Sequence, residues 1–219
     1  MSLKIVFMGT PDFSIPSLEI LKESNHEIVC VYTQPPKKKL RGQKILKSAV
    51  HIFSENKGIK VRINKLSDKK EYEDFIKLNA DLVVVIAYGQ IIPDIYLKIP
   101  NLIFLNVHAS LLPRWRGAAP IERAILNKDS ETGVSIMKIE KKLDAGPFIK
   151  QVKIKINKDS TSGELIKKLS NIGAEALKES IDLVSSGKAI FLKAVFYYFF
   201  YIFLKDFQFS GLTKYYSKI

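Results

Sequence analysis

The chain has 219 residues, of which 47% are hydrophobic and 26% charged. These proportions are typical of a globular protein and exclude a disordered chain, and the length suits one domain with a small appendage. Cys30 is the single cysteine, which excludes an intramolecular disulfide, and we expect a cytoplasmic protein without a secretory leader. The formal net charge of +13 fits either a surface of solvated lysines or a polyanionic partner.

Apolar strand patterns alternate with helical patterns from the first residues onward. Strands are predicted over residues 4–8, 27–32, 59–63, 81–87, 102–107, 132–139 and 148–156. Helices are predicted over residues 13–21, 44–57, 69–78, 117–126 and 161–186. Continuous apolar runs such as 81–87 suit strands that are buried on both faces. The alternation therefore predicts an α/β fold with a mostly parallel sheet and helices on both faces, in which residues 148–156 form a more exposed edge strand.

A basic segment follows the second predicted strand. No acidic residue lies between Glu27 and Glu55, whereas six basic residues fall within residues 37–47: Lys37, Lys38, Lys39, Arg41, Lys44 and Lys47. Pro35, Pro36 and Gly42 disfavour a regular helix here, so a basic loop is predicted. Such a loop is either ordinary exposed surface or a contact for a phosphate backbone.

Asn106 and His108 stand where the strand over residues 102–107 ends. Functional residues of parallel sheets gather beyond the carboxyl ends of strands, and positions i and i+2 of one strand share a face. An amide can donate to a developing oxyanion, an imidazole can exchange a proton, and a carboxylate such as Asp144 can orient the imidazole. Each residue alone is also compatible with a structural role, Asp144 as a turn residue for example. Together with the loop over residues 110–117, they favour a carbonyl-handling active site.

Other chemistries lack their motifs in this chain. One cysteine and three histidines give no zinc-type spacing, so no metal is expected. The sequence contains neither a Gly-x-Ser-x-Gly elbow nor a phosphate-binding Gly-Lys-Ser/Thr loop.

The C-terminal part differs in character from the rest. The helix over residues 161–186 is opened by a capping box of Ser160 or Thr161 with Glu164 and closed by Gly187. From Ala189 to Leu204 the chain is apolar except for Lys193, which is short for a membrane span of about 20 residues. A buried terminal helix, an interfacial anchor and sequence without an evolved role all remain open. We therefore divide the chain into a catalytic domain, residues 1–187, and an aromatic-rich tail of uncertain structure, residues 188–219.

Several motifs, taken in order, resemble those of the methionyl-tRNA formyltransferase family over residues 1 to about 187. They are Met8–Phe13, Val85–Pro93, Asn106–His108, Ser110–Ile121, Glu131–Val134 and Leu143–Gly146. The resemblance implies a Rossmann-like catalytic domain that transfers a formyl group from 10-formyltetrahydrofolate to the amino group of methionyl initiator tRNA. It further implies that Asn106 binds the formyl oxygen, that His108 is the general acid and base, and that Asp144 tunes His108.

The resemblance also suggests binding residues and partners. The folate site would include Ser110, Leu111, Leu112 and Pro113. The tRNA acceptor arm would contact Lys37, Lys38, Lys39, Arg41, Gly42 and Lys44, although Pro36-Lys-Lys-Lys stands where the family usually has an Asp-Arg-Pro-like segment. We expect a monomer without stable membrane association.

The C-terminus departs from the family pattern. The family's C-terminal β-barrel domain is expected to be missing, and the aromatic tail would reflect a truncated gene, a lineage-specific tail or a membrane-surface anchor. The remaining alternatives for function are a folate-dependent formyltransferase or hydrolase acting on a small molecule, and a remnant that binds folate or RNA without turnover.

Overall fold

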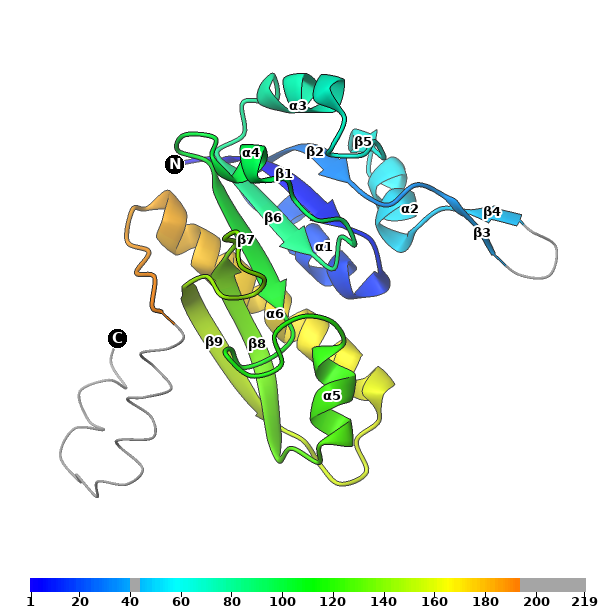
Figure 1. Ribbon diagram of the computed structural model, residues 1–219, viewed down its shortest axis with the longest axis vertical. Coiled ribbons are helices and arrows are strands. Elements are labelled where there is room, and N and C mark those ends of the chain that lie inside the picture. The colour runs from blue at the N-terminus through cyan, green and yellow to red at the C-terminus, as the bar shows by residue number, and fades with distance from the viewer. Residues whose placement is uncertain (40–43, 194–219) are drawn as a thin grey trace.

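The computed structural model describes residues 1–39 and 44–193, and residues 40–43 and 194–219 lie outside the described part. The described residues form a seven-stranded sheet flanked by helices, from which a small two-stranded hairpin projects (Figure 1).

The sheet has the order β5-β2-β1-β6-β7-β8-β9. Its first five strands are parallel to one another: β5 (Val61–Arg62), β2 (Glu27–Tyr32), β1 (Lys4–Gly9), β6 (Leu82–Ile86) and β7 (Ile103–His108). Two antiparallel strands complete it, β8 (Glu131–Lys138) and, at the edge, β9 (Phe148–Lys155). The predicted mostly parallel sheet and its exposed edge strand are confirmed.

Each face of the sheet packs against its own set of helices. Leu105 and Val107 belong to a core cluster with α1 (Ile15–Glu23), α2 (Ala49–Asn56), α5 (Pro120–Leu126) and α6 (Ser162–Ser185). Phe104 faces the other way, into a cluster with Phe75 of α3 (Lys69–Ile76) and Tyr96 of α4 (Asp94–Leu97). The alternation of apolar side chains along each strand thus supplies both cores, as a doubly covered sheet requires.

Local chemistry accounts for several helix ends. At α6, the Thr161 hydroxyl accepts from the Glu164 backbone N–H while the Glu164 carboxylate accepts from that of Thr161, which confirms the predicted capping box. Gly187 ends this segment with φ of +69°, a conformation that glycine adopts without steric cost. The 3-10 turn η1 (Asp12–Ser14) leads from β1 into α1.

Two predicted helices begin later than expected. Residues 44–46 are not helical: β4 (Lys44–Leu46) pairs antiparallel with β3 (Lys37–Lys39), and α2 begins only after Ser48, whose side chain accepts from His51 N–H. The basic segment is therefore partly a hairpin rather than a loop. Likewise α5 begins at Pro120 rather than at residue 117, because Gly117 and Ala119 have φ of +85° and +53°. The short helix α4 was not predicted.

The first residues of the C-terminal tail attach to the edge of the sheet. Leu192 exchanges two backbone hydrogen bonds with Phe148, of 2.9 and 2.8 Å, and Phe191 packs against the core cluster that contains Leu105 and Val107. The rest of the predicted aromatic tail, residues 194–219, lies outside the described residues. In the described ranges, no helix is both long and apolar enough to cross a membrane.

Candidate active site

Strand β7 places the two central candidate residues on one face of the sheet. Asn106 and His108 follow Phe104 at two-residue intervals, so they face away from α6, while Leu105 and Val107 pack toward it. His108 is the last residue of β7 and is 6% exposed, and Asn106 is partly exposed. Beyond the carboxyl end of a parallel strand, this is where a site is expected.

The His108 imidazole is held between a carbonyl and a carboxylate. Its Nε2 lies 3.0 Å from the carbonyl oxygen of Trp115, and its Nδ1 lies 3.7 Å from Oδ2 of Asp144. A carbonyl can only accept, so Nε2 carries a proton in this arrangement. In the neutral ring the basic atom is then Nδ1, and a proton taken there faces the Asp144 carboxylate. The geometry thus suits an imidazole that gains and loses a proton next to a fixed negative charge.

Asp144 reaches His108 from the loop between β8 and β9. Its Oδ2 accepts a hydrogen bond of 2.8 Å from the Gly117 backbone N–H, which ties this loop to the segment after β7. Asp144 itself has φ of +44°, a left-handed conformation that aspartate tolerates better than most residues. The structure therefore brings His108 and Asp144 together, 36 residues apart in sequence.

A buried hydroxyl fixes the segment that follows His108. Ser135 Oγ on β8 donates to the Ser110 carbonyl at 2.6 Å and accepts from Leu112 N–H at 3.1 Å and from Gln151 Nε2 at 2.8 Å. The Ser110 hydroxyl in turn donates to the Arg114 carbonyl at 2.6 Å. This network holds the segment that brings the Trp115 carbonyl against His108, although the segment lacks regular secondary structure.

A charged cluster anchors the same segment from outside. The Arg114 guanidinium donates two hydrogen bonds to Asp129, of 2.9 and 2.6 Å, and lies over the Trp115 ring, whose indole N–H also donates to Asp129. Hydrogen bonds from Arg114, and further ones from Asn127 and Trp115, hold the pKa of Asp129 well below its usual range. This carboxylate stays ionised and anchors the loop through its hydrogen bonds with Arg114 and Trp115.

The sequence did not reveal the backbone groups that complete the site. The Trp115 carbonyl and the Gly117 N–H contact His108 and Asp144 through the main chain, and every non-proline residue carries such groups. The only local signal is Gly117, whose φ of +85° suits glycine.

The four residues expected at the folate site differ in their exposure to solvent. Ser110 and Leu112 are buried, and the Ser110 hydroxyl is engaged by the Arg114 carbonyl. Leu111 and Pro113 are partly exposed and, with Leu112, line a cavity of about 320 Å³ that extends to Gln151 and Lys153. A role of this segment in folate binding stays a prediction.

Four of the six residues expected to bind tRNA belong to the β3–β4 hairpin. Lys37, Lys38 and Lys39 form β3 and Lys44 begins β4, while Arg41 and Gly42 lie outside the described residues. The hairpin projects from the body of the molecule near α2 (Figure 1). At its base, Gln34 Nε2 and Thr10 Oγ1 both donate to the Tyr88 carbonyl, so the ends of β1, β2 and β6 are tied together there.

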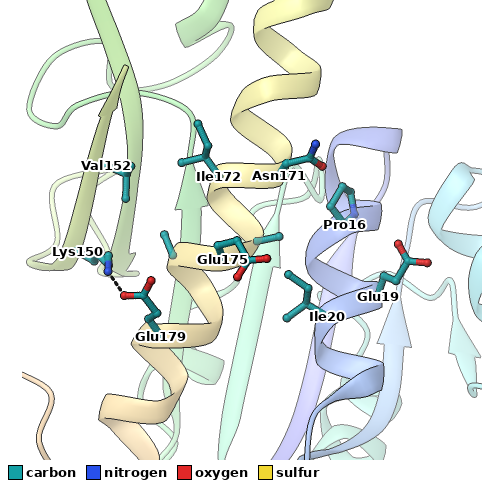
Figure 2. A pocket seen from close by; sticks show the side chains of 11 residues that line it. Pro16, Glu19, Ile20, Lys150, Val152, Asn171, Ile172, Glu175 and Glu179 are labelled. Atoms are coloured by element: carbon teal, nitrogen blue, oxygen red, sulfur yellow. Dashed lines mark hydrogen bonds and ion pairs between the residues drawn. The ribbon is translucent and has the colours of Figure 1, made fainter. Parts of the chain in front are cut away.

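A separate groove of about 680 Å³ lies on the opposite face of the sheet (Figure 2). Side chains of α1, α6 and β9 line it, and Lys150 pairs with Glu179 across it. Because α1 and α6 cover the face opposite to His108, this groove is not part of the candidate active site. Among the described residues, no group of three His, Cys, Asp or Glu side chains is arranged to hold a metal ion.

Comparison with known proteins agrees with this architecture. Residues 3–181 match the formyl transferase family. Methionyl-tRNA formyltransferase of Pelagibacter ubique is 51% identical over 194 residues, which are 87% of this chain and 62% of the relative. The chain thus spans about three fifths of the length of that relative.

Solved structures share the fold at low sequence identity. Phosphoribosylglycinamide formyltransferase of Anaplasma phagocytophilum superposes with a TM-score of 0.70 at 18% identity, covering 86% of this chain and 89% of that one. A sugar 3N-formyl transferase, crystallised in the presence of dTDP and 5-N-formyl-THF, gives 0.65 at 22% identity, covering 89% and 67%. With the family match extending over most of its length, the chain belongs to the formyl transferase family.

Proposed function

We propose that this chain transfers a formyl group from 10-formyltetrahydrofolate to the amino group of methionyl initiator tRNA, in the cytoplasm. The observation that carries the proposal is the 51% identity to a methionyl-tRNA formyltransferase over 194 residues. The juxtaposition of His108 and Asp144 at the end of β7, 3.7 Å apart, supports it, because formyl transfer needs a proton carrier with a fixed countercharge.

In the proposed reaction, the lone pair of the methionyl amine attacks the formyl carbon of the donor. The Asn106 amide donates a hydrogen bond to the oxygen as it becomes negative, a contribution of about 3 kcal/mol where such donors have been removed from other enzymes. Collapse of the tetrahedral intermediate breaks the bond between the formyl carbon and N10, and the formyl group stays on the amine.

His108 carries the proton that this reaction must move. The attacking amine becomes an ammonium and loses a proton, while N10 needs one as it leaves. Nδ1 of His108 takes the first proton, and the imidazolium is stabilised by Asp144 until the proton passes to N10. Asp144 is itself fixed by the Gly117 N–H, so the countercharge needs no reorganisation during the reaction.

The tRNA part of the proposal rests on charge as well as on the relative. The β3–β4 hairpin carries Lys37, Lys38, Lys39 and Lys44 without an acidic residue between Glu27 and Glu55. Cations gathered on a projecting hairpin release counterions when they meet phosphates, which favours binding of a nucleic acid.

The test offers the purified chain 10-formyltetrahydrofolate with three acceptors in separate reactions: methionyl initiator tRNA, free amines and water. We expect formyl-methionyl-tRNA and no comparable product from the other two. Formylation of a free amine, or release of formate at a higher rate, would replace the proposal by a small-molecule transferase or a hydrolase. Absence of every product at high enzyme concentration would contradict an active enzyme.

A further inference from the structure

Arg116 is a half-buried cation that the reaction described above does not use. Its Nε is shielded from solvent and has no hydrogen-bond partner among the described residues. Charged groups that are shielded from water are normally paired, because a lone buried charge is costly. The solvent-shielded Nε–H of Arg116 is therefore a free donor for a partner that the described residues do not provide.

The carboxylates that contact the neighbours of Arg116 in the chain have partners of their own. Asp144 accepts from Gly117 N–H and faces His108, and Asp129 binds Arg114 and Trp115. Arg114, two positions earlier, shows the contrast: its guanidinium has a bidentate carboxylate partner. Arg116 Nε has no such partner among the described residues.

Arg116 also stands between the two backbone groups that complete the active site. The Trp115 carbonyl before it meets His108, and the Gly117 N–H after it meets Asp144. Consecutive α-carbons are about 3.8 Å apart, so Arg116 is within one peptide unit of each contact. Because hydrogen bonds hold the main chain on both sides, the backbone of Arg116 needs little reordering when a ligand binds, which lowers the entropy lost on binding.

We propose that Arg116 binds an oxyanion that arrives with the substrate. A planar guanidinium suits a phosphate or a carboxylate equally, since both offer two oxygens to its N–H groups. Under the proposed function, which this inference extends, the anion is either a phosphodiester at the acceptor end of the tRNA or a carboxylate of the folate glutamyl group. In both cases Arg116 fixes one substrate beside His108.

The test measures equilibrium binding, so it does not depend on turnover. Three variants are compared with the wild type for affinity toward 5-formyltetrahydrofolate and toward initiator tRNA: Arg116→Gln, Arg116→Lys and the control Arg123→Gln. Arg123 is an exposed arginine on α5, so its loss removes one charge from the same region. Urea unfolding of each variant reports whether the fold is retained.

We expect Arg116→Gln to lower the affinity for one of the two ligands at least tenfold, as loss of a charge-assisted hydrogen bond implies. The affinity of Arg116→Lys should lie between those of Arg116→Gln and the wild type, and the affinity of Arg123→Gln should stay within twofold of the wild type. A loss confined to the folate ligand, and absent with 5-formyltetrahydropteroate, which lacks the glutamyl carboxylates, assigns the anion to the carboxylate. A loss confined to tRNA, with a shallower salt dependence, assigns it to the phosphate.

Two outcomes would overturn the inference. Unchanged affinities for both ligands in Arg116→Gln would show that the guanidinium is only structural. A wild type that binds neither ligand would show that Arg116 does not bind the proposed anion. Failure of the proposed function is a separate result: the wild type would then bind without forming a formylated product, and the effect of Arg116→Gln on binding would still decide the inference.

Discussion

Asp144 combines a left-handed backbone with the charge that faces His108. At its φ of +44°, asparagine is tolerated as well as aspartate, and an amide oxygen can still accept from Gly117 N–H. Asp144→Asn should therefore keep the loop in place while removing the countercharge 3.7 Å from Nδ1 of His108. We expect the rate of formyl transfer to fall about 10²–10⁴-fold, the range of a positioned acid–base group.

The measurement is the single-turnover rate, with the urea midpoint as a check on folding. Asp94→Asn is a suitable control, because Asp94 is paired with Lys141 at the surface rather than with the imidazole. An Asp144→Asn rate within a few-fold of the wild type would show that the carboxylate charge is not needed.

Glu71 of α3 is a buried carboxylate that pairs with Arg62 of β5. Burial alone raises its pKa, but hydrogen bonds from Arg62, Tyr32 and Asn64 outweigh burial, so its pKa lies below the ordinary value. Because the folded-state pKa is depressed, this group contributes stability that is complete above its unfolded pKa, about 4.3, and is lost as the pH falls through the folded value.

We therefore expect the free energy of unfolding to fall below about pH 5, and Glu71→Gln to show a flatter dependence on pH. At neutral pH, Glu71→Gln should cost roughly 3 kcal/mol, because it removes one partner of a buried ion pair. Urea denaturation at a series of pH values measures both effects. The exposed Glu175 on α6 provides the control, Glu175→Gln, and equal pH slopes for the two variants would refute the assignment.

Two glycines of α6 separate helix propensity from packing. A Cβ at Gly163 would meet nothing within 4 Å, whereas one at Gly173 would lie 2.9 Å from Cγ1 of Val107 on β7. Gly163→Ala should stabilise the protein by about 0.5–1 kcal/mol through helix propensity. Gly173→Ala should destabilise it by roughly 1–3 kcal/mol, because α6 must move away from the strand that carries His108.

Thermal unfolding of both variants checks the comparison. Val107→Ala in the Gly173→Ala background removes the clashing methyl group, so the two substitutions should be less than additive. Stabilisation by Gly173→Ala alone would mean that the contact between α6 and β7 is looser than the structure indicates.

At the scale of elements, features that depend on residues close in sequence can be predicted from the sequence, whereas features that depend on distant contacts cannot. The capping box of Thr161 and Glu164 is readable because its residues are three apart. The start of α2 is not, because the spacing of residues 44–46 also suits a helix, and only their pairing with residues 37–39 makes them a strand. In the site, strand alternation predicts that Asn106 and His108 share a face. The contacts of the Trp115 carbonyl and the Gly117 N–H depend on loop conformation, which no side-chain pattern specifies.

For the whole molecule, the net charge of +13 raises the question of which basic residues bind tRNA. If the β3–β4 hairpin contacts phosphates, neutralising Lys37, Lys38 and Lys39 to Gln should make the dependence of tRNA affinity on salt shallower by about one unit for each lost contact. The matched control removes three exposed lysines of α6, outside the hairpin, Lys167, Lys168 and Lys178, and should leave the slope unchanged. Equal slopes for the two triple variants, measured by filter binding, would make the hairpin ordinary surface.

The central claim is that the residues at the end of β7 perform formyl transfer. Its most direct test is the rate at which wild type and His108→Ala form formyl-methionyl-tRNA in a single turnover, with saturating 10-formyltetrahydrofolate and circular dichroism confirming the fold. A rate about 10²–10⁴-fold lower in His108→Ala, at similar affinity for tRNA, is the predicted result. Formation of product by a folded His108→Ala variant at the wild-type rate would contradict it.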